Sequence, residues 1–195
     1  MSAIFGPKAG IRRCGVSGMR KNRMGRVRVR VLAAALSLAM VAACSPEYNW
    51  REVSVGGGAG MVLFPDKPRS QQRSLEFAGH EVQFTLTTAD IGGTLFAVGQ
   101  APWPAPMLAD ESLRQGMGKE VVASLYRNLG REAPAELPGF GQLFEVNGDA
   151  SSGMRLRAQV WITEYGLVEG IVMGPADGFP DAAAGEFLES VAKGR

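Results

Sequence analysis

The sequence predicts an α+β domain, an antiparallel β-sheet with two packed helices, behind an N-terminal export signal. Residues 50–100 and 140–173 contain short apolar or alternating segments separated by glycine and proline, a pattern typical of strands joined by tight turns. Residues 110–129 and 180–194 instead carry apolar side chains at helical spacing. A basic segment and a short apolar run precede all of these elements. Strands of this kind with helices on one or both faces form a layered α+β fold.

The N-terminal segment has the layout of a cleaved export signal. Residues 26–30 are rich in arginine, and the apolar run 31–41 is too short to cross a bilayer. Two alanines, the second of them Ala43, then precede Cys44. We therefore expect residues 1–43 to form a signal peptide that is cleaved after Ala43. The basic region is long for a signal, and two later methionines are alternative starts: Met19 and Met24.

The segment Val41-Ala42-Ala43-Cys44 resembles the bacterial lipobox, in which a branched apolar residue and two small ones precede a cysteine that is acylated. The resemblance implies a lipoprotein whose Cys44 carries covalent fatty acids such as palmitate. Residues 44–49 would then be a short tether to a single domain over residues 50–195. Two alternatives stay open. A plain secretory signal would leave Cys44 as a free thiol in an oxidising compartment, and a retained anchor would need about 20 apolar residues.

The charge of the chain changes when the signal is set aside. Nine of the 21 basic residues precede Cys44 and all 19 acidic residues follow it, so the remaining chain has 12 basic residues and a net charge of about −7. This balance gives no electrostatic argument for binding nucleic acid or anionic lipid headgroups. Cys14 would leave with the signal, so no disulfide and no cysteine-based metal site is expected. Ser45 stands where an aspartate would resemble an inner-membrane retention signal, which favours the periplasmic face of the outer membrane over the inner membrane.

Five strands are predicted in the first half of the domain: Trp50–Val55, Met61–Phe64, Gln71–Ala78, Glu81–Thr88 and Thr94–Val98. The glycine-rich segment 56–60 joins the first two strands as a hairpin, because glycine adopts positive φ without strain. Gly79-His80 is expected to join the next two. The fourth strand alternates apolar and polar residues, so one of its faces should be buried.

A proline-rich connection and a helix follow. Ala101–Pro106 has prolines at every second position, which forbids a helix there and predicts an extended segment. The next helix is expected to have Asp110 as its N-cap and to end at Gly130. Its core-facing residues are Leu113, Met117, Val121, Val122, Leu125 and Leu129. Gly116 and Gly118 should weaken its first half by about 1 kcal/mol each relative to alanine.

Three strands and a second helix complete the domain. The strands are predicted at Phe140–Val146, Arg155–Thr163 and Leu167–Met173. The middle strand alternates, with Leu156, Ala158, Val160 and Ile162 inward and with Arg155, Arg157, Gln159, Trp161 and Thr163 outward. The closing helix is expected from Pro180 to Gly194. Its apolar residues follow helical spacing: Ala184, Phe187, Leu188 and Val191.

The order of these elements and three short motifs resemble the PsbP-like α/β/α sandwich. This domain occurs in an extrinsic photosystem protein and in many small bacterial lipoproteins. The motifs are Val62–Pro68, Gly166–Pro175 and Phe187–Ser190. The resemblance implies a non-enzymatic binding or assembly module, and it assigns no functional residue to this chain.

The search for catalytic and metal-binding residues is largely negative. His80, the one histidine, lies in a predicted turn, and no Gly-x-Ser-x-Gly segment is present to position a nucleophilic serine. We interpret His80 as structural. Four acidic residues are interpreted as solvated strand ends: Glu145, Asp149, Glu164 and Glu169. The sequence thus predicts no catalytic residue, no metal site and no cofactor apart from the lipid on Cys44.

Two features could serve recognition. Trp103, between prolines, is either a lid over the sheet or an exposed anchor for a partner. The outward row of Arg155, Arg157, Gln159 and Trp161 either lies under a helix or faces a ligand. The function predicted from these features is a non-catalytic envelope adaptor that binds another envelope protein. The alternatives are a lipoprotein that binds a small ligand in a pocket between sheet and helices and, more distantly, a hydrolase.

Overall fold

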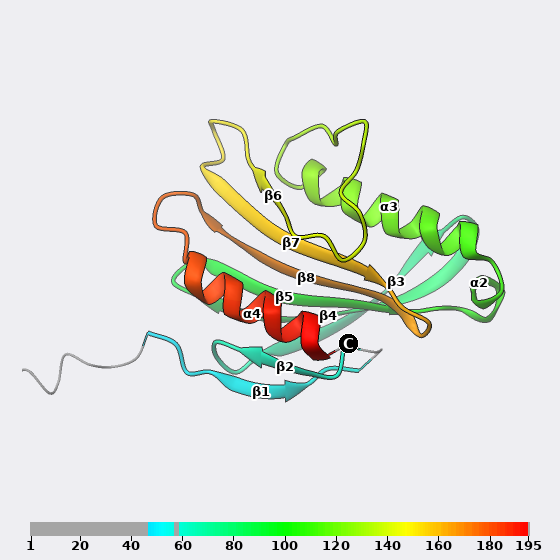
Figure 1. Cartoon of the computed structure of the whole chain (residues 1–195), viewed down its shortest axis with the longest axis horizontal. Helices are drawn as coiled ribbons and strands as arrows, with labels where there is room; N and C mark the ends of the chain where they lie inside the picture. Colours follow the sequence, from blue (N-terminus) through cyan, green and yellow to red (C-terminus); the bar gives the residue numbers. More distant parts are fainter. Residues whose placement is uncertain (1–46, 57–58, 195) are drawn as a thin grey trace, which may run out of the picture. The chain divides into compact units, whose positions relative to one another are not determined.

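The computed structural model describes residues 47–56 and 59–194, which belong to one compact unit of the chain (Figure 1). The predicted signal peptide with its cleavage site at Ala43, and the predicted lipidation site Cys44, lie outside the described residues. The strands are β1 (Arg51–Ser54), β2 (Met61–Phe64), β3 (Arg69–Phe77), β4 (His80–Ile91), β5 (Thr94–Pro102), β6 (Phe144–Asn147), β7 (Met154–Ile162) and β8 (Gly166–Pro175). The helices are α2 (Ala105–Leu108), α3 (Glu111–Arg127) and α4 (Asp181–Gly194).

The described strands form two antiparallel sheets. Six strands lie in the order β3-β4-β5-β8-β7-β6, and β1 pairs with β2 in a separate hairpin. The predicted α+β fold with an antiparallel sheet is thereby confirmed. After β5 the chain forms α2, α3, β6 and β7, and it returns with β8 to pair with β5 along Leu95–Pro102. This return places β5 and β8 in the middle of the six-stranded sheet.

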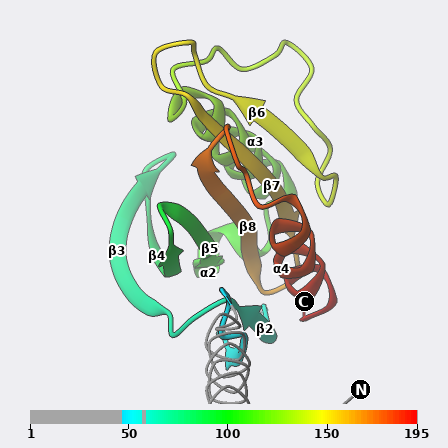
Figure 2. The same cartoon turned by 90° about the vertical axis from the view of Figure 1, so that its left-hand side faces the viewer.

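Alternate residues of this sheet face two different helices. On β8, Val168 and Val172 belong to the core beneath α4, whereas Leu167 and Ile171 belong to the core beneath α3. Figure 2 shows α3 and α4 on different sides of β7 and β8. Because both faces are covered, the central strand β8 needs apolar residues at nearly every position and lacks the alternation of a half-exposed strand.

The β1–β2 hairpin packs against α4. The ring of Phe64 on β2 lies 5.3 Å from the ring of Phe187 on α4, edge to face. Gly60, which precedes β2, has a φ of +58°, and a Cβ at this position would overlap the carbonyl group of Gly194. Only glycine therefore allows this close approach between hairpin and helix. The hairpin and the closing helix are both confirmed.

Helix α3 begins as its sequence predicts. Asp110 Oδ1 accepts a hydrogen bond from the Leu113 N–H at 3.0 Å, which confirms the N-cap. Of the predicted apolar stripe, Met117, Val122 and Leu125 are buried within α3, and Leu129 is buried just after the helix ends at Arg127. Gly118 is unfavourable for helix formation, but its lack of a side chain allows α3 to pack closely against its neighbours. A Cβ on Gly118 would lie 2.5 Å from Phe140 Cε1 and 2.9 Å from Ile162 Cδ1, so the close packing of α3 requires glycine here.

The predicted proline-rich connection and the strand predicted at Phe140–Val146 differ from the structure. Pro106 lies inside the short helix α2, so the prediction that the prolines forbid a helix was wrong. Pro106 occupies the first turn of α2, where the backbone N–H groups have no partner within the helix, so the N–H that proline lacks is not needed. The strand predicted at Phe140–Val146 begins only at Phe144. Gly141 adopts a φ of +78° and turns the chain before that strand starts.

Candidate functional site

A half-open apolar cavity lies between α3 and the six-stranded sheet. Its volume is about 510 Å³, which falls within the usual range of small-molecule sites. The side chains that line it come from β3, β4, β5, β7, β8 and the second half of α3 with its C-cap: Arg73, Leu75, Phe84, Leu86, Leu95, Ala97, Val121, Ser124, Leu125, Asn128, Leu156, Glu169, Ile171 and Met173. Arg73 and Leu75 are exposed, so the mouth of this α3 cavity lies beside β3.

The α3 cavity exists because α3 leaves part of its sheet face uncovered. The helix lies against β7, while Phe84 and Leu86 on β4 and Leu95 on β5 are only partly buried. Leu75 on the edge strand β3 is 43% exposed. Apolar side chains that the fold itself does not cover form the kind of surface that takes an apolar ligand.

Of the residues that line the α3 cavity, Glu169 alone carries a carboxyl group. It lies within β8 and is 5% exposed. Gly99 lies directly across from it on β5, and a Cβ there would be 2.6 Å from Glu169 Cγ and 2.7 Å from Phe84 Cζ. The missing side chain of Gly99 therefore makes the space that the Glu169 side chain occupies.

Burial changes the ionisation of this carboxyl group. Its removal from water disfavours the charged form and raises the pKa of Glu169 from its ordinary value of 4.5 to about 7. No described residue forms a hydrogen bond with Glu169 Oε2. A buried polar atom without a partner destabilises a fold by about 1–3 kcal/mol. The carboxyl group is thus able to gain a hydrogen bond from a molecule that enters the cavity.

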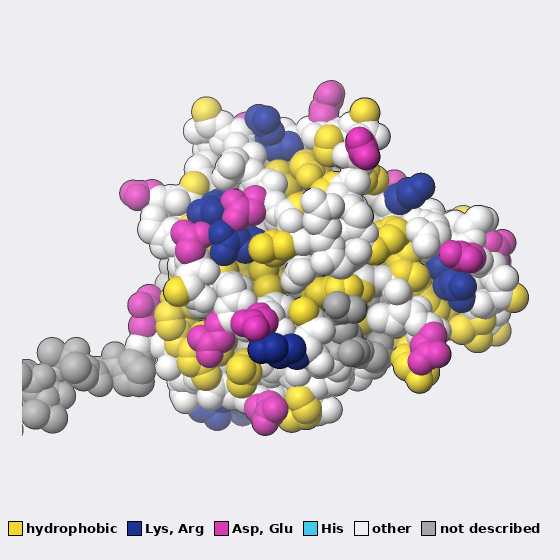
Figure 3. Space-filling model, in the orientation of Figure 1, with side chains coloured by type: hydrophobic (Ala, Val, Ile, Leu, Met, Phe, Trp, Pro, Cys, Tyr) yellow, Lys and Arg dark blue, Asp and Glu magenta, His cyan; other side chains and the backbone are white. Residues whose placement is uncertain are grey.

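The two arginines of the predicted recognition row are bonded within the protein. Arg155 Nη2 lies 2.7 Å from Glu145 Oε2, and Arg157 Nη2 lies 2.7 Å from Asp181 Oδ1 at the start of α4. The Arg155 guanidinium also lies 4.7 Å from the centre of the Phe179 ring. Hydrogen bonds from Arg155 and then Arg157 lower the pKa of Glu145, although partial burial opposes this. Figure 3 shows basic and acidic side chains in contact over the N-terminal end of α4.

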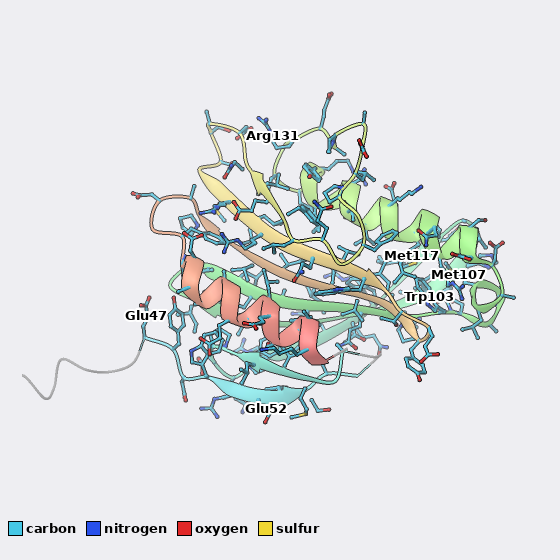
Figure 4. The ribbon with its side chains drawn as sticks, viewed as in Figure 1. Glu47, Glu52, Trp103, Met107, Met117 and Arg131 are labelled. Atoms are coloured by element: carbon cyan, nitrogen blue, oxygen red, sulfur yellow. The ribbon has the colours of Figure 1, made fainter. Side chains whose placement is uncertain are left out.

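Both tryptophans considered for recognition are buried. Trp103 is 6% exposed and donates its Nε1–H to the Thr163 carbonyl at 2.9 Å. It belongs with Met107 and Met117 to the core beneath α3, and Figure 4 shows these three residues close together at one end of the domain. Trp161 is 3% exposed and belongs to the core beneath α4. Burial favours the packing alternative over an exposed partner contact for both residues.

Glu169 is the residue of the α3 cavity whose surroundings the sequence interpretation missed. Glu164 is exposed, as a solvated strand end should be, but Glu169 is buried within β8, so the solvated interpretation was wrong for Glu169. The signal was a lone acidic residue that interrupts the apolar run Leu167–Met173. In a strand covered on both faces, such a residue loses most of its contact with water.

His80 is not among the residues that line the α3 cavity. It begins β4 opposite Phe77, because the turn before it is Ala78-Gly79, both with positive φ, rather than the predicted Gly79-His80. No group of three or more histidine, cysteine, aspartate or glutamate side chains that could hold a metal ion occurs in the described part of the chain.

Comparisons with known proteins give no information about the function of this chain. Neither family models nor curated proteins nor solved structures match this chain. None of the helices within residues 47–56 and 59–194 is long and apolar enough to cross a membrane. The cavity and its buried carboxyl group are therefore the features from which we infer a function.

Proposed function

We propose that the domain binds a small, largely apolar molecule in the α3 cavity and that lipid on Cys44 holds it at the envelope membrane. The cavity itself supports this proposal, with its volume of about 510 Å³, its mostly apolar walls and one buried carboxyl group. Small-molecule sites generally combine such walls with a few polar groups that orient the ligand. A lipid anchor would keep the protein beside the phase into which apolar molecules partition.

The envelope adaptor, the outer-membrane location and the PsbP-like assignment stay proposals of lower rank. For the adaptor, the named contact residues offer little free surface, since Trp103 and Trp161 are buried and Arg155 and Arg157 bind acidic side chains. The PsbP-like assignment is supported by the layer order of α3, antiparallel sheet and α4.

Binding of a hydrocarbon fluorophore tests the ligand-binding proposal directly. We would titrate diphenylhexatriene, which emits strongly only in apolar surroundings, into the full chain carrying Cys44→Ser, so that no detergent competes for the cavity. Val121→Trp should block the cavity because Val121 lines it from α3. Lys119→Trp is the matched control, since it adds the same side chain at an exposed position of the same helix.

We expect saturable binding of diphenylhexatriene to the unblocked chain and to Lys119→Trp, and at least a tenfold weaker signal for Val121→Trp. Circular dichroism of all three proteins would check that they are folded. The proposal fails if the folded, unblocked chain does not bind the fluorophore. It also fails if the two tryptophan variants bind it equally well.

A further inference from the structure

We propose that the ligand of the α3 cavity carries an amino group at its buried end and that Glu169 recognises this group. The inference rests on the proposed function and adds the chemical class of the ligand. It predicts an amphipathic amine with an apolar body and an amino group at one end.

Glu169 lies where it can form a hydrogen bond with a ligand in the cavity. Its side chain lines the cavity, is 5% exposed and has an Oε2 atom with no hydrogen-bond partner among the described residues. Gly99, directly across on β5, leaves room for it, since any Cβ there would overlap the glutamate side chain. A buried carboxyl group without a partner weakens the fold, and an entering donor would relieve that penalty.

The charges around the cavity decide between classes of ligand. Arg73 and Glu169 are the ionisable residues of the lining, and Arg73 is exposed at the mouth. The Ser124 side chain in the lining donates its hydroxyl hydrogen bond to the Val121 carbonyl at 2.7 Å. A fatty acid that entered with its head group first would place its own carboxylate against Glu169, where two like charges repel. An alcohol could donate one hydrogen bond, whereas an ammonium group donates up to three and compensates the charge of the carboxylate.

The strand register gives the distance that a ligand spans across the sheet. Glu169 lies across from Gly99, Gly99 from Leu86, and Leu86 from Gln71 on the edge strand β3. Three strand spacings of about 4.8 Å separate β8 from β3, so the cavity extends about 14 Å across the sheet from Glu169 to the strand at its mouth. Apart from Arg73, Ser124, Asn128 and Glu169, the side chains that line the cavity are apolar. A medium-length alkylamine with its nitrogen at Glu169 fits this distance.

Competition against diphenylhexatriene in the full Cys44→Ser chain tests the inference. The competitors are dodecylamine, 1-dodecanol and dodecanoate, each below the concentration at which it forms micelles or separates from water. Glu169→Gln keeps the shape of the side chain and removes its charge. Glu186→Gln, at an exposed position of α4, is the control for loss of one carboxylate.

We expect dodecylamine to displace the fluorophore at a concentration at least tenfold lower than 1-dodecanol, with dodecanoate weakest. Glu169→Gln should remove the advantage of the amine and leave displacement by the alcohol within twofold. Glu186→Gln should leave the order unchanged. If the fluorophore binds but amine and alcohol compete equally, or if Glu169→Gln keeps the preference, the amine inference is overturned and the cavity proposal stands. If the fluorophore does not bind to the folded chain, both are overturned.

Discussion

Replacement of Glu169 by glutamine should change how stability depends on pH. The pKa of this group is about 7 in the folded chain, against an ordinary value of 4.5, because burial disfavours the charged form. A folded-state pKa above the unfolded value means that the native protein binds the proton more tightly. The resulting stability is fully present below pH 4.5 and is lost as the pH rises through 7.

The magnitude follows from the two pKa values. Each tenfold difference in proton affinity corresponds to about 1.4 kcal/mol, so ionisation of Glu169 should destabilise the fold by about 3 kcal/mol in total, most of it between pH 5 and 8. Glutamine does not ionise. Glu169→Gln should therefore match the unsubstituted chain near pH 5 and exceed its unfolding free energy by about 2–3 kcal/mol at pH 8.

Urea unfolding followed by tryptophan fluorescence at pH 5, 6, 7 and 8 measures this difference. The chain has three tryptophans, and Trp103 and Trp161 are buried, so their emission should report unfolding. Subtraction of the two curves removes the titration of every other group. Glu186→Gln should change the unfolding free energy by at most about 0.5 kcal/mol, as surface substitutions usually do. Parallel curves for Glu169→Gln and the unsubstituted chain would refute the idea that this carboxyl group is buried away from water in solution.

Three further predictions concern packing, the charge cluster and the anchor. Gly118→Ala should destabilise the fold by about 1–2 kcal/mol, because its Cβ would overlap Phe140. Gly116→Ala on the same helix should stabilise the fold by up to about 1 kcal/mol, because alanine favours a helix and its Cβ has room. Thermal unfolding of the two variants compares them. Glu145→Gln should lower the unfolding free energy by about 1 kcal/mol at neutral pH and by less in acid. The reason is that the pKa of Glu145 is lowered in the folded chain, so the stability that its carboxylate contributes is lost as the pH falls below 4.5. Urea unfolding at pH 3 and 7 tests this. Cys44→Ser should abolish fatty-acid labelling and release the protein from membranes, and a serine variant that stays membrane-bound would place the anchor elsewhere.

Local patterns made much of the fold predictable. The alternation of β7, the N-cap at Asp110 and the helical spacing of α4 each depend on neighbouring residues, so they can be read from the chain directly. The pairing of β5 with β8 could not be read in this way. It joins residues more than sixty positions apart, and periodicity carries no information about which strands become neighbours. For the same reason, the sequence did not show that α3 leaves β4 partly uncovered.

The candidate site became visible only when two local irregularities were seen to be neighbours. Gly99 weakens the interior of a strand, and Glu169 interrupts an apolar one, so each alone is an unexplained departure from what a buried strand prefers. The register places them directly opposite each other, where the space left by the glycine holds the carboxyl group. Departures from local preference that persist in a stable fold commonly mark functional positions. Two such departures that meet in one cavity are more informative than either alone, because a purely structural core would be better packed with a side chain at the first position and no charge at the second.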